Sequence, residues 1–90
     1  MMKNALILLL LFPALLLAED AAYLKYMEGE KATTAEKRKE AFNEALTLYL
    51  KMQDDHPSAS LSFNIANTYF QLSEYGYAIL YYRKALKEEA

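Results

Sequence analysis

Apolar residues recur at helical spacing over most of this chain. In the clearest stretch they fall on one side of a helix and the polar residues fall on the other. The apolar side consists of Phe42, Ala45, Leu46, Tyr49, Leu50 and Met52. The polar side consists of Glu40, Glu44, Thr47 and Lys51. This period is typical of an amphipathic helix, and no run after residue 18 shows the alternation of a half-buried strand.

The pattern predicts about four helices after residue 18. The first is expected at 20–31, the third at 59–72 and the fourth at 75–88. The second should begin after an N-cap at Thr33 or Thr34 and end in the DDHP sequence at 54–57. Pro57 should end the second helix because it disfavours helix at the residue before it. Ser73 and Glu74 should separate the last two helices. The expected fold class is therefore all-α.

Residues 1–18 form a Leu-rich leader with a single charged side chain, Lys3. As a helix, the apolar run 5–18 would be roughly 21 Å long, shorter than the roughly 30 Å hydrocarbon core of a bilayer. A short basic start, an apolar run of this length and a closing Ala18 are typical of a secretory signal peptide. We expect cleavage after Ala18 and export. An uncleaved N-terminal anchor and a buried core helix are the alternatives.

Composition narrows the function. The chain has no Cys, which excludes disulfides, thiolate metal sites, Cys nucleophiles and a lipid attachment site near the cut. Without Lys3 the formal charge falls from −2 to about −3, which argues against nucleic acid and an anionic membrane surface as partners. The only histidine, His56, stands before a proline, and no Ser–His–Asp set, Gly-rich phosphate loop or metal-ligand spacing is found. We expect no enzymatic activity, no cofactor and no metal site.

The sequence NIANTYFQLSEYGYAILYYRKAL carries small and aromatic residues at fixed offsets. They are Ile65-Ala66, Tyr69, Ala78, Tyr82 and Ala85. In these positions residues 59–90 resemble a tetratricopeptide repeat (TPR). The small residues would let two helices approach closely, and the tyrosines would fill the seam between them. The resemblance implies antiparallel helix hairpins from a right-handed α-solenoid.

Two residues depart from the family pattern. Ser62 stands where a large side chain is usual, so Leu61 or Phe63 would have to cover that end of the repeat. Ser73 stands where the first helix of a repeat usually ends in Gly, which makes a left-handed conformation there less favourable.

Upstream, the resemblance is partial. Ala45, Tyr49 and Pro57 match family offsets, while Tyr23 and Tyr26 match the first helix only if about ten extra residues separate the two helices. We predict three parts: a signal peptide at 1–18, a degenerate TPR-like hairpin at 19–57, and a TPR repeat at 58–90. A plain helical cap is the alternative for the second part. This order also resembles the exported or membrane-associated TPR proteins of bacterial aerotolerance (Bat) operons, which implies a periplasmic or cell-envelope location.

The third predicted helix has an unusual outer face. No residue from 58 to 72 is charged. In TPR proteins the first helix of each repeat lines a concave groove, and the resemblance assigns Phe63, Asn64, Asn67, Phe70 and Gln71 to that groove. Amides can pair with the backbone of an extended peptide, and phenylalanines can contact its side chains. Packing against a neighbouring repeat, or a solvent-bridged face, is the alternative for these residues.

Two further residues, Tyr77 and Leu80, lie off the packing stripe of the fourth helix and are candidates for a secondary contact. A solenoid unit usually needs about three repeats to bury its core. We therefore expect the outer face of helix 75–88 to be covered by further sequence, a partner or a second copy. The expected function is an exported adaptor or scaffold that binds a protein or peptide. The alternative is a structural or self-assembling helical piece, or a fragment of a longer TPR protein, without a ligand groove. A membrane would be contacted only through an uncleaved leader.

Overall fold

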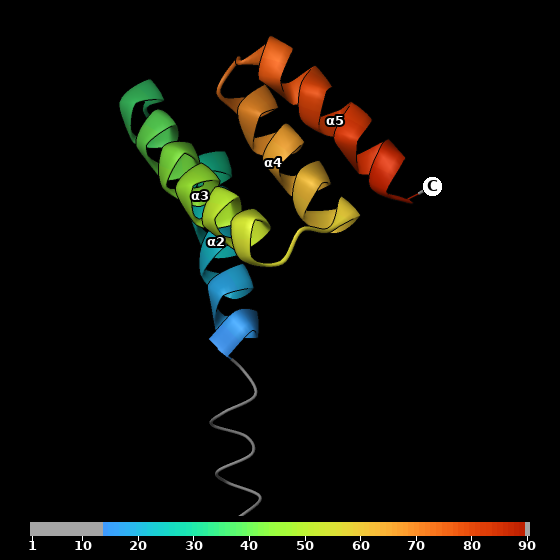
Figure 1. Cartoon of the computed structure of the whole chain (residues 1–90). Coiled ribbons are helices and arrows are strands. Elements are labelled where there is room, and N and C mark those ends of the chain that lie inside the picture. The colour runs from blue at the N-terminus through green and yellow to red at the C-terminus, as the bar shows by residue number, and fades with distance from the viewer. Residues whose placement is uncertain (1–13, 90) are drawn as a thin grey trace, which may run out of the picture.

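The protein, described here as a computed structural model, is all-helical over the described residues, 14–89 (Figure 1). Its helices are α2 (Ala14–Lys31), α3 (Ala35–Asp55), α4 (Ala59–Gln71) and α5 (Tyr75–Glu89). The prediction of an all-α chain with four helices after the leader is confirmed for this part of the chain. Residues 1–13, most of the predicted signal peptide, lie outside the described residues.

Helix α2 begins earlier than the sequence pattern indicated. It starts at Ala14, not at residue 20, and passes through the predicted cleavage position after Ala18 as one helix. The physical reason is local: residues 14–18 read ALLLA, and Ala and Leu have the highest helix propensities. No Gly or Pro interrupts the sequence between Ala14 and Gly29.

Side-chain caps define where α3 and α4 begin. Of the two predicted N-caps of α3, Thr34 is the one used, and its side chain accepts a hydrogen bond from the backbone N–H of Lys37 at 3.2 Å. Helix α3 ends at Asp55, just before His56 and Pro57, as predicted. Ser58 then caps α4 by accepting from the backbone N–H of Leu61 at 3.1 Å.

The turn between α4 and α5 is built on a left-handed serine. Ser73 has φ = 61°, and its N–H donates to the carbonyl of Phe70 at 3.0 Å. The N–H of Glu74 donates to the carbonyl of Tyr69 at 2.9 Å, which completes a Schellman motif. The family's usual glycine is absent, yet the chain still adopts the conformation that glycine favours, because these bonds satisfy the last carbonyls of α4.

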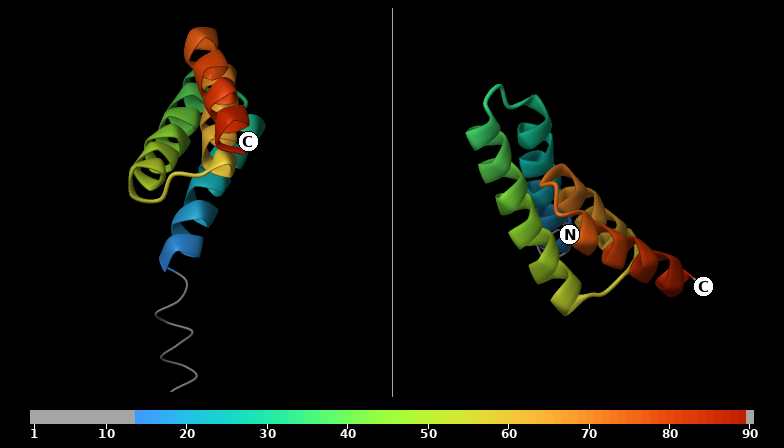
Figure 2. Two further views of the ribbon diagram at one scale, coloured as in Figure 1. Left: turned by 45° about the vertical axis from the view of Figure 1, so that its right-hand side comes forward. Right: turned by 90° about the horizontal axis from the view of Figure 1, so that it is seen from above.

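The helices form two antiparallel hairpins. Helix α2 packs along α3, α4 packs along α5, and α3 joins the hairpins by packing against α4. From above, the two hairpins diverge, and α2 and α4 lie on the side away from the viewer of Figure 1 (Figure 2). Helix α5 is therefore the outermost helix of the second hairpin.

The core is shared by three helices. Its central cluster consists of Ala22, Ala45, Tyr49, Met52, Leu61 and Ile65. Helix α5 joins the packing mainly through two alanines, Ala78 and Ala85, which are buried against α4. Helices α4 and α5 pack against each other as predicted, and Ile65 and Ala66 of α4 are fully buried. Ile65, however, lies in the cluster shared with α2 and α3, and Tyr82 contacts Phe63 and Asn67, outside the predicted seam. Alanines at the contact allow the two helix axes to approach closely.

Ser62 is fully buried but satisfied by hydrogen bonds. Its Oγ accepts from the Nε2 of Gln53 on α3 and donates to the Oε1 of Glu88 on α5, both at 2.7 Å. The Oε1 of Gln53 in turn accepts from the backbone N–H of Ser58 at 3.2 Å. The large side chain that the TPR pattern expects here is thus replaced by a polar link between three helices. Leu61, next to Ser62 in the sequence, is buried as well.

Gly29 allows the close contact between α2 and α3. A Cβ placed on Gly29 would lie 2.8 Å from three ring atoms of Phe42. The Phe42 ring is fully buried and packs edge-on against Tyr26, with the ring centroids 5.1 Å apart. The ring therefore has little room to move away. Gly76, by contrast, has open space around the corresponding position.

Replacement of Gly29 by Ala should lower stability, because overpacking costs about 1–3 kcal/mol and outweighs the roughly 1 kcal/mol gained in helix propensity. Gly76→Ala is the matched control and should raise stability by about 0.5–1 kcal/mol. Thermal unfolding followed by circular dichroism would measure both. A Gly29→Ala protein that melts at a higher temperature than the wild type would show that the contact with Phe42 is not restrictive.

Replacement of Ser73 by Gly should raise stability by about 0.5–1 kcal/mol. A left-handed conformation costs a residue with a Cβ about 1–2 kcal/mol, and glycine avoids this cost. Part of the gain is lost because glycine gives the unfolded chain more conformational freedom. Ser73→Ala keeps the Cβ and should give no such gain. Chemical denaturation of the two variants would distinguish them. Equal midpoints for Gly and Ala at this position would contradict the assignment of strain to Ser73.

Candidate partner-binding surfaces

The exposed part of α4 is a narrow strip between its contacts with α5 and with α2. The five residues predicted to line a groove all lie on or beside this strip: Phe63, Asn64, Asn67, Phe70 and Gln71. The structure divides them into a pair of phenylalanines and a set of amides, which have different neighbours.

Phe63 and Phe70 lean toward α5. The Phe63 ring packs edge-on against Tyr82 with a centroid distance of 5.6 Å, and Phe70 packs in the same way against Tyr75 at 5.4 Å. Both phenylalanines are still more than half exposed. Edge-on pairs of this kind favour a fixed orientation of the rings. The two rings are therefore held in place while presenting one side to solvent.

Asn67 and Gln71 are each held by a tyrosine from a neighbouring helix. The Tyr82 hydroxyl of α5 donates to the Oδ1 of Asn67. The Nε2 of Gln71 donates to the Tyr26 hydroxyl of α2 at 3.3 Å. Among the described residues, the Nδ2 of Asn67 and the Oε1 of Gln71 have no partner, so one amide offers a donor and the other an acceptor.

Asn64 is half-buried beside them. Its backbone carbonyl accepts from the Thr68 hydroxyl at 2.7 Å, and its side-chain amide makes no hydrogen bond with the part of the chain that the structure describes.

The protonation state of Tyr82 supports its role as a donor. Burial raises the pKa of Tyr82 above its usual value of 10, and the nearby Tyr26 hydroxyl acts in the same direction. The phenol therefore stays protonated throughout the neutral range and can keep donating to Asn67.

Tyr77 and Leu80 lie elsewhere on α5, away from Phe63 and Phe70. Both are more than half exposed, as expected for residues off the packing stripe. Tyr77 nevertheless stacks on Tyr69 of α4, with ring centroids 5.1 Å apart and an interplanar angle of 23°. Burial, followed by the neighbouring Tyr81, Tyr77 and Glu74, raises the pKa of Tyr69. Tyr77 thus belongs partly to a tyrosine cluster, whereas Leu80 projects into solvent.

The sequence pattern did not reveal a second apolar stripe on α5. Tyr75, Ile79, Tyr82 and Leu86 follow one another at intervals of four, three and four residues. Beside Tyr82 and Leu86, the two helices enclose an open hollow of about 530 Å³. It is lined by Ala59, Ser60, Phe63, Tyr82, Ala85, Leu86 and Glu89. Spacing alone could have indicated the stripe, but not that it continues into Phe63 and Phe70.

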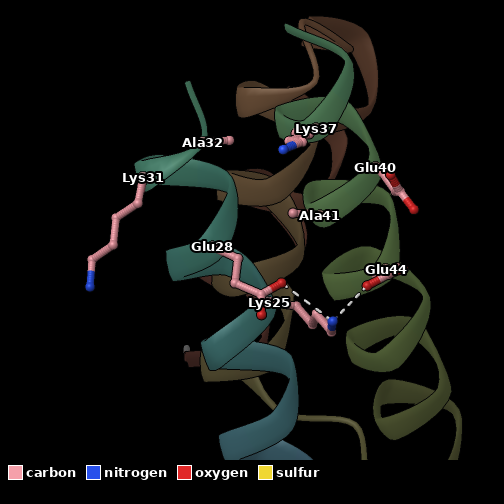
Figure 3. A pocket seen from close by; sticks show the side chains of 8 residues that line it. All are labelled: Lys25, Glu28, Lys31, Ala32, Lys37, Glu40, Ala41 and Glu44. Atoms are coloured by element: carbon pink, nitrogen blue, oxygen red, sulfur yellow. Dashed lines mark hydrogen bonds and ion pairs between the residues drawn. The ribbon is translucent and has the colours of Figure 1, made fainter. Parts of the chain in front are cut away.

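A charged hollow of about 460 Å³ lies between α2 and α3 (Figure 3). Lys25 stands between Glu28 and Glu44, with N···O distances of 3.3 and 2.9 Å. Hydrogen bonds from Glu44 and then Glu28 raise the pKa of Lys25. The lysine and its two carboxylates satisfy one another, and exposed pairs of this kind contribute little to stability. This hollow therefore has no evident binding role.

Neither a metal-binding cluster nor a membrane-spanning helix is found in the part of the chain that the structure describes. No group of three or more His, Cys, Asp or Glu side chains converges there in a way that could hold a metal ion. Within residues 14–89, no helix is both long and apolar enough to cross a membrane.

Two surfaces remain as candidates: the two held amides with free hydrogen-bonding groups, and an apolar face of aromatic and aliphatic side chains. Comparison of the chain with protein-family models, with curated proteins and with solved structures finds no match.

Proposed function

We propose that this chain is an exported, non-enzymatic TPR protein that acts as an adaptor or scaffold and binds an extended peptide, or a segment of an envelope protein, on α4. The observation that carries the proposal is the pair of amides at Asn67 and Gln71. The Oδ1 of Asn67 and the Nε2 of Gln71 are hydrogen-bonded to tyrosines, and the Nδ2 of Asn67 and the Oε1 of Gln71 are free. The proposed TPR relationship rests on the sequence pattern of residues 59–90, and export rests on the leader.

The spacing of the two amides suits an extended peptide. Residues four apart on a helix have their Cβ atoms about 5–6 Å apart, close to the about 6.6–6.8 Å that separates every second residue of an extended strand. The free Nδ2 of Asn67 would donate to a peptide carbonyl, and the free Oε1 of Gln71 would accept from a peptide N–H. Asn64, beside them, offers a further amide.

Pre-organisation favours this role over that of a solvated face. A flexible Gln loses rotamer entropy when it binds a ligand, and part of that cost is already met when its Nε2 is bonded to Tyr26. Phe63 and Phe70 border the amides and expose about half of their surface, so they can contact side chains of the ligand. Residues 58–72 carry no charged side chain, so this face would not select for a charged ligand.

Selection of peptides from a displayed library of short random sequences, with the full chain as bait, would test the proposal. The enriched peptides should bind the Asn67→Ala and Gln71→Ala variants about tenfold more weakly than the wild type, because each variant leaves a peptide group without its partner. Asn43→Ala, an exposed amide on α3, is the matched control and should leave binding unchanged.

The circular dichroism spectrum of each variant would establish that the helices are intact. Failure to enrich any peptide, or enriched peptides that bind the two α4 variants as tightly as the wild type, would overturn the proposed groove.

A further inference from the structure

The second hairpin carries a continuous apolar face that no part of residues 14–89 covers. On α5 it consists of Tyr75, Ile79, Tyr82 and Leu86, and on α4 of Phe63 and Phe70. All except Tyr82 are more than half exposed, and Leu86 reaches 69%. The contacts of Phe63 with Tyr82 and of Phe70 with Tyr75 join the two helices into one surface.

We propose that this face is the interface of a two-fold symmetric homodimer in which α5 packs antiparallel to α5 of a second copy. This inference goes beyond the proposed peptide groove: the two surfaces share Phe63 and Phe70, but the central residue of the interface, Ile79, lies on α5 and has no part in the groove.

The exposed area is of the size that a dimer needs. A large aromatic side chain has roughly 150–250 Å² of surface, so the five half-exposed side chains leave on the order of 500 Å² of apolar area. That is most of the roughly 800 Å² that each partner contributes to a stable interface. It also lies at the upper end of the roughly 300–600 Å² range for the largest apolar patch on a monomer.

The stripe on α5 is complementary to itself. Intervals of four, three and four residues are those of the core positions of a coiled coil, which pack against another helix. Tyr75 and Leu86 lie at equal distances on either side of the midpoint between residues 80 and 81, and so do Ile79 and Tyr82. In an antiparallel pair, each aromatic residue of one copy therefore faces an aliphatic residue of the other, which is the arrangement that a two-fold axis requires.

The hollow beside Leu86 fits the same arrangement. In the antiparallel dimer, Tyr75 of the second copy lies opposite Leu86, at the open hollow of about 530 Å³ between the ends of α4 and α5. A tyrosine ring can enter a hollow of this size. None of the six positions on the face carries a charge, so pairing two copies buries no ionised side chain at these positions.

Engineered cysteines would test the geometry, since the natural chain contains none. The full-length Tyr75→Cys and Leu86→Cys chains, expressed together under oxidising conditions, should form a disulfide-linked dimer on a non-reducing gel. Either variant alone should not, because the antiparallel arrangement places two copies of the same end far apart. Leu86→Cys paired with Leu80→Cys is the matched control and should not crosslink, since Leu80 is equally exposed but lies off the stripe.

Sedimentation of the full chain, as recovered from cells, would test the association itself. The wild type should sediment as a dimer. Ile79→Glu should weaken the dimer by about a hundredfold or more, because it would bury an unpaired charge near the axis. Leu80→Glu should leave the dimer unchanged. Both positions are exposed in the monomer, so both variants should keep the wild-type helix content.

Three results would overturn the homodimer: a wild-type chain that sediments as a monomer, a Tyr75→Cys and Leu86→Cys pair that crosslinks no more than the Leu80→Cys control, or a crosslink to a different polypeptide. The outcome is separable from that of the peptide groove. Ile79→Glu acts on association and Gln71→Ala acts on peptide binding, whereas Asn67 also contacts Tyr82 of the dimer face and is not used to separate the two.

Discussion

The packing of α4 is the constraint on which the rest of the structure depends. This helix touches each of the other three, through Ile65 in the shared core, Asn67 beside Tyr82 of α5, and Gln71 beside Tyr26 of α2. Because neighbouring helices occupy most of its circumference, only a narrow strip is left for solvent. A charge on the packed sides would be buried at a high cost, which explains why α4 has none there. The same crowding brings Phe63, Asn67 and Phe70 against tyrosines of α5.

Polar side chains at these contacts hold the helices together in defined positions. Ser62 links α3 to α5 through Gln53 and Glu88, and it does so without leaving a buried polar group unpaired. A satisfied polar network of this kind favours one arrangement of helices over others, because sliding a helix would break its hydrogen bonds. Asn67 and Gln71 are fixed in the same way from the outer side, and this leaves them with free atoms that can act on a ligand.

The two proposed surfaces meet along Phe63 and Phe70. On one side of these rings lie the amides of α4, and on the other lies the apolar stripe of α5. Helix α5 is packed on its inner side largely through Ala78 and Ala85, so its larger side chains remain outside. A second neighbour on this face would add hydrophobic burial, which contributes about 25 cal/mol per Å² of apolar surface.

The sequence by itself determined the helices, all but one of their boundaries within a few residues and the pairing of α4 with α5, because propensity, capping and the helical period are local properties. Thr34, Pro57 and the alanines at 66, 78 and 85 are examples. The start of α2 at Ala14 differs from the predicted start at residue 20, because residues 14–18 are themselves strong helix formers. What only the tertiary structure decided is which side chains meet across helices: Ser62 with Gln53 and Glu88, Gln71 with Tyr26, and Phe63 and Phe70 with the tyrosines of α5. These contacts join residues far apart in the chain. A helical period gives the side of a helix on which a residue lies, but the identity of its neighbour there depends on how the other helices pack.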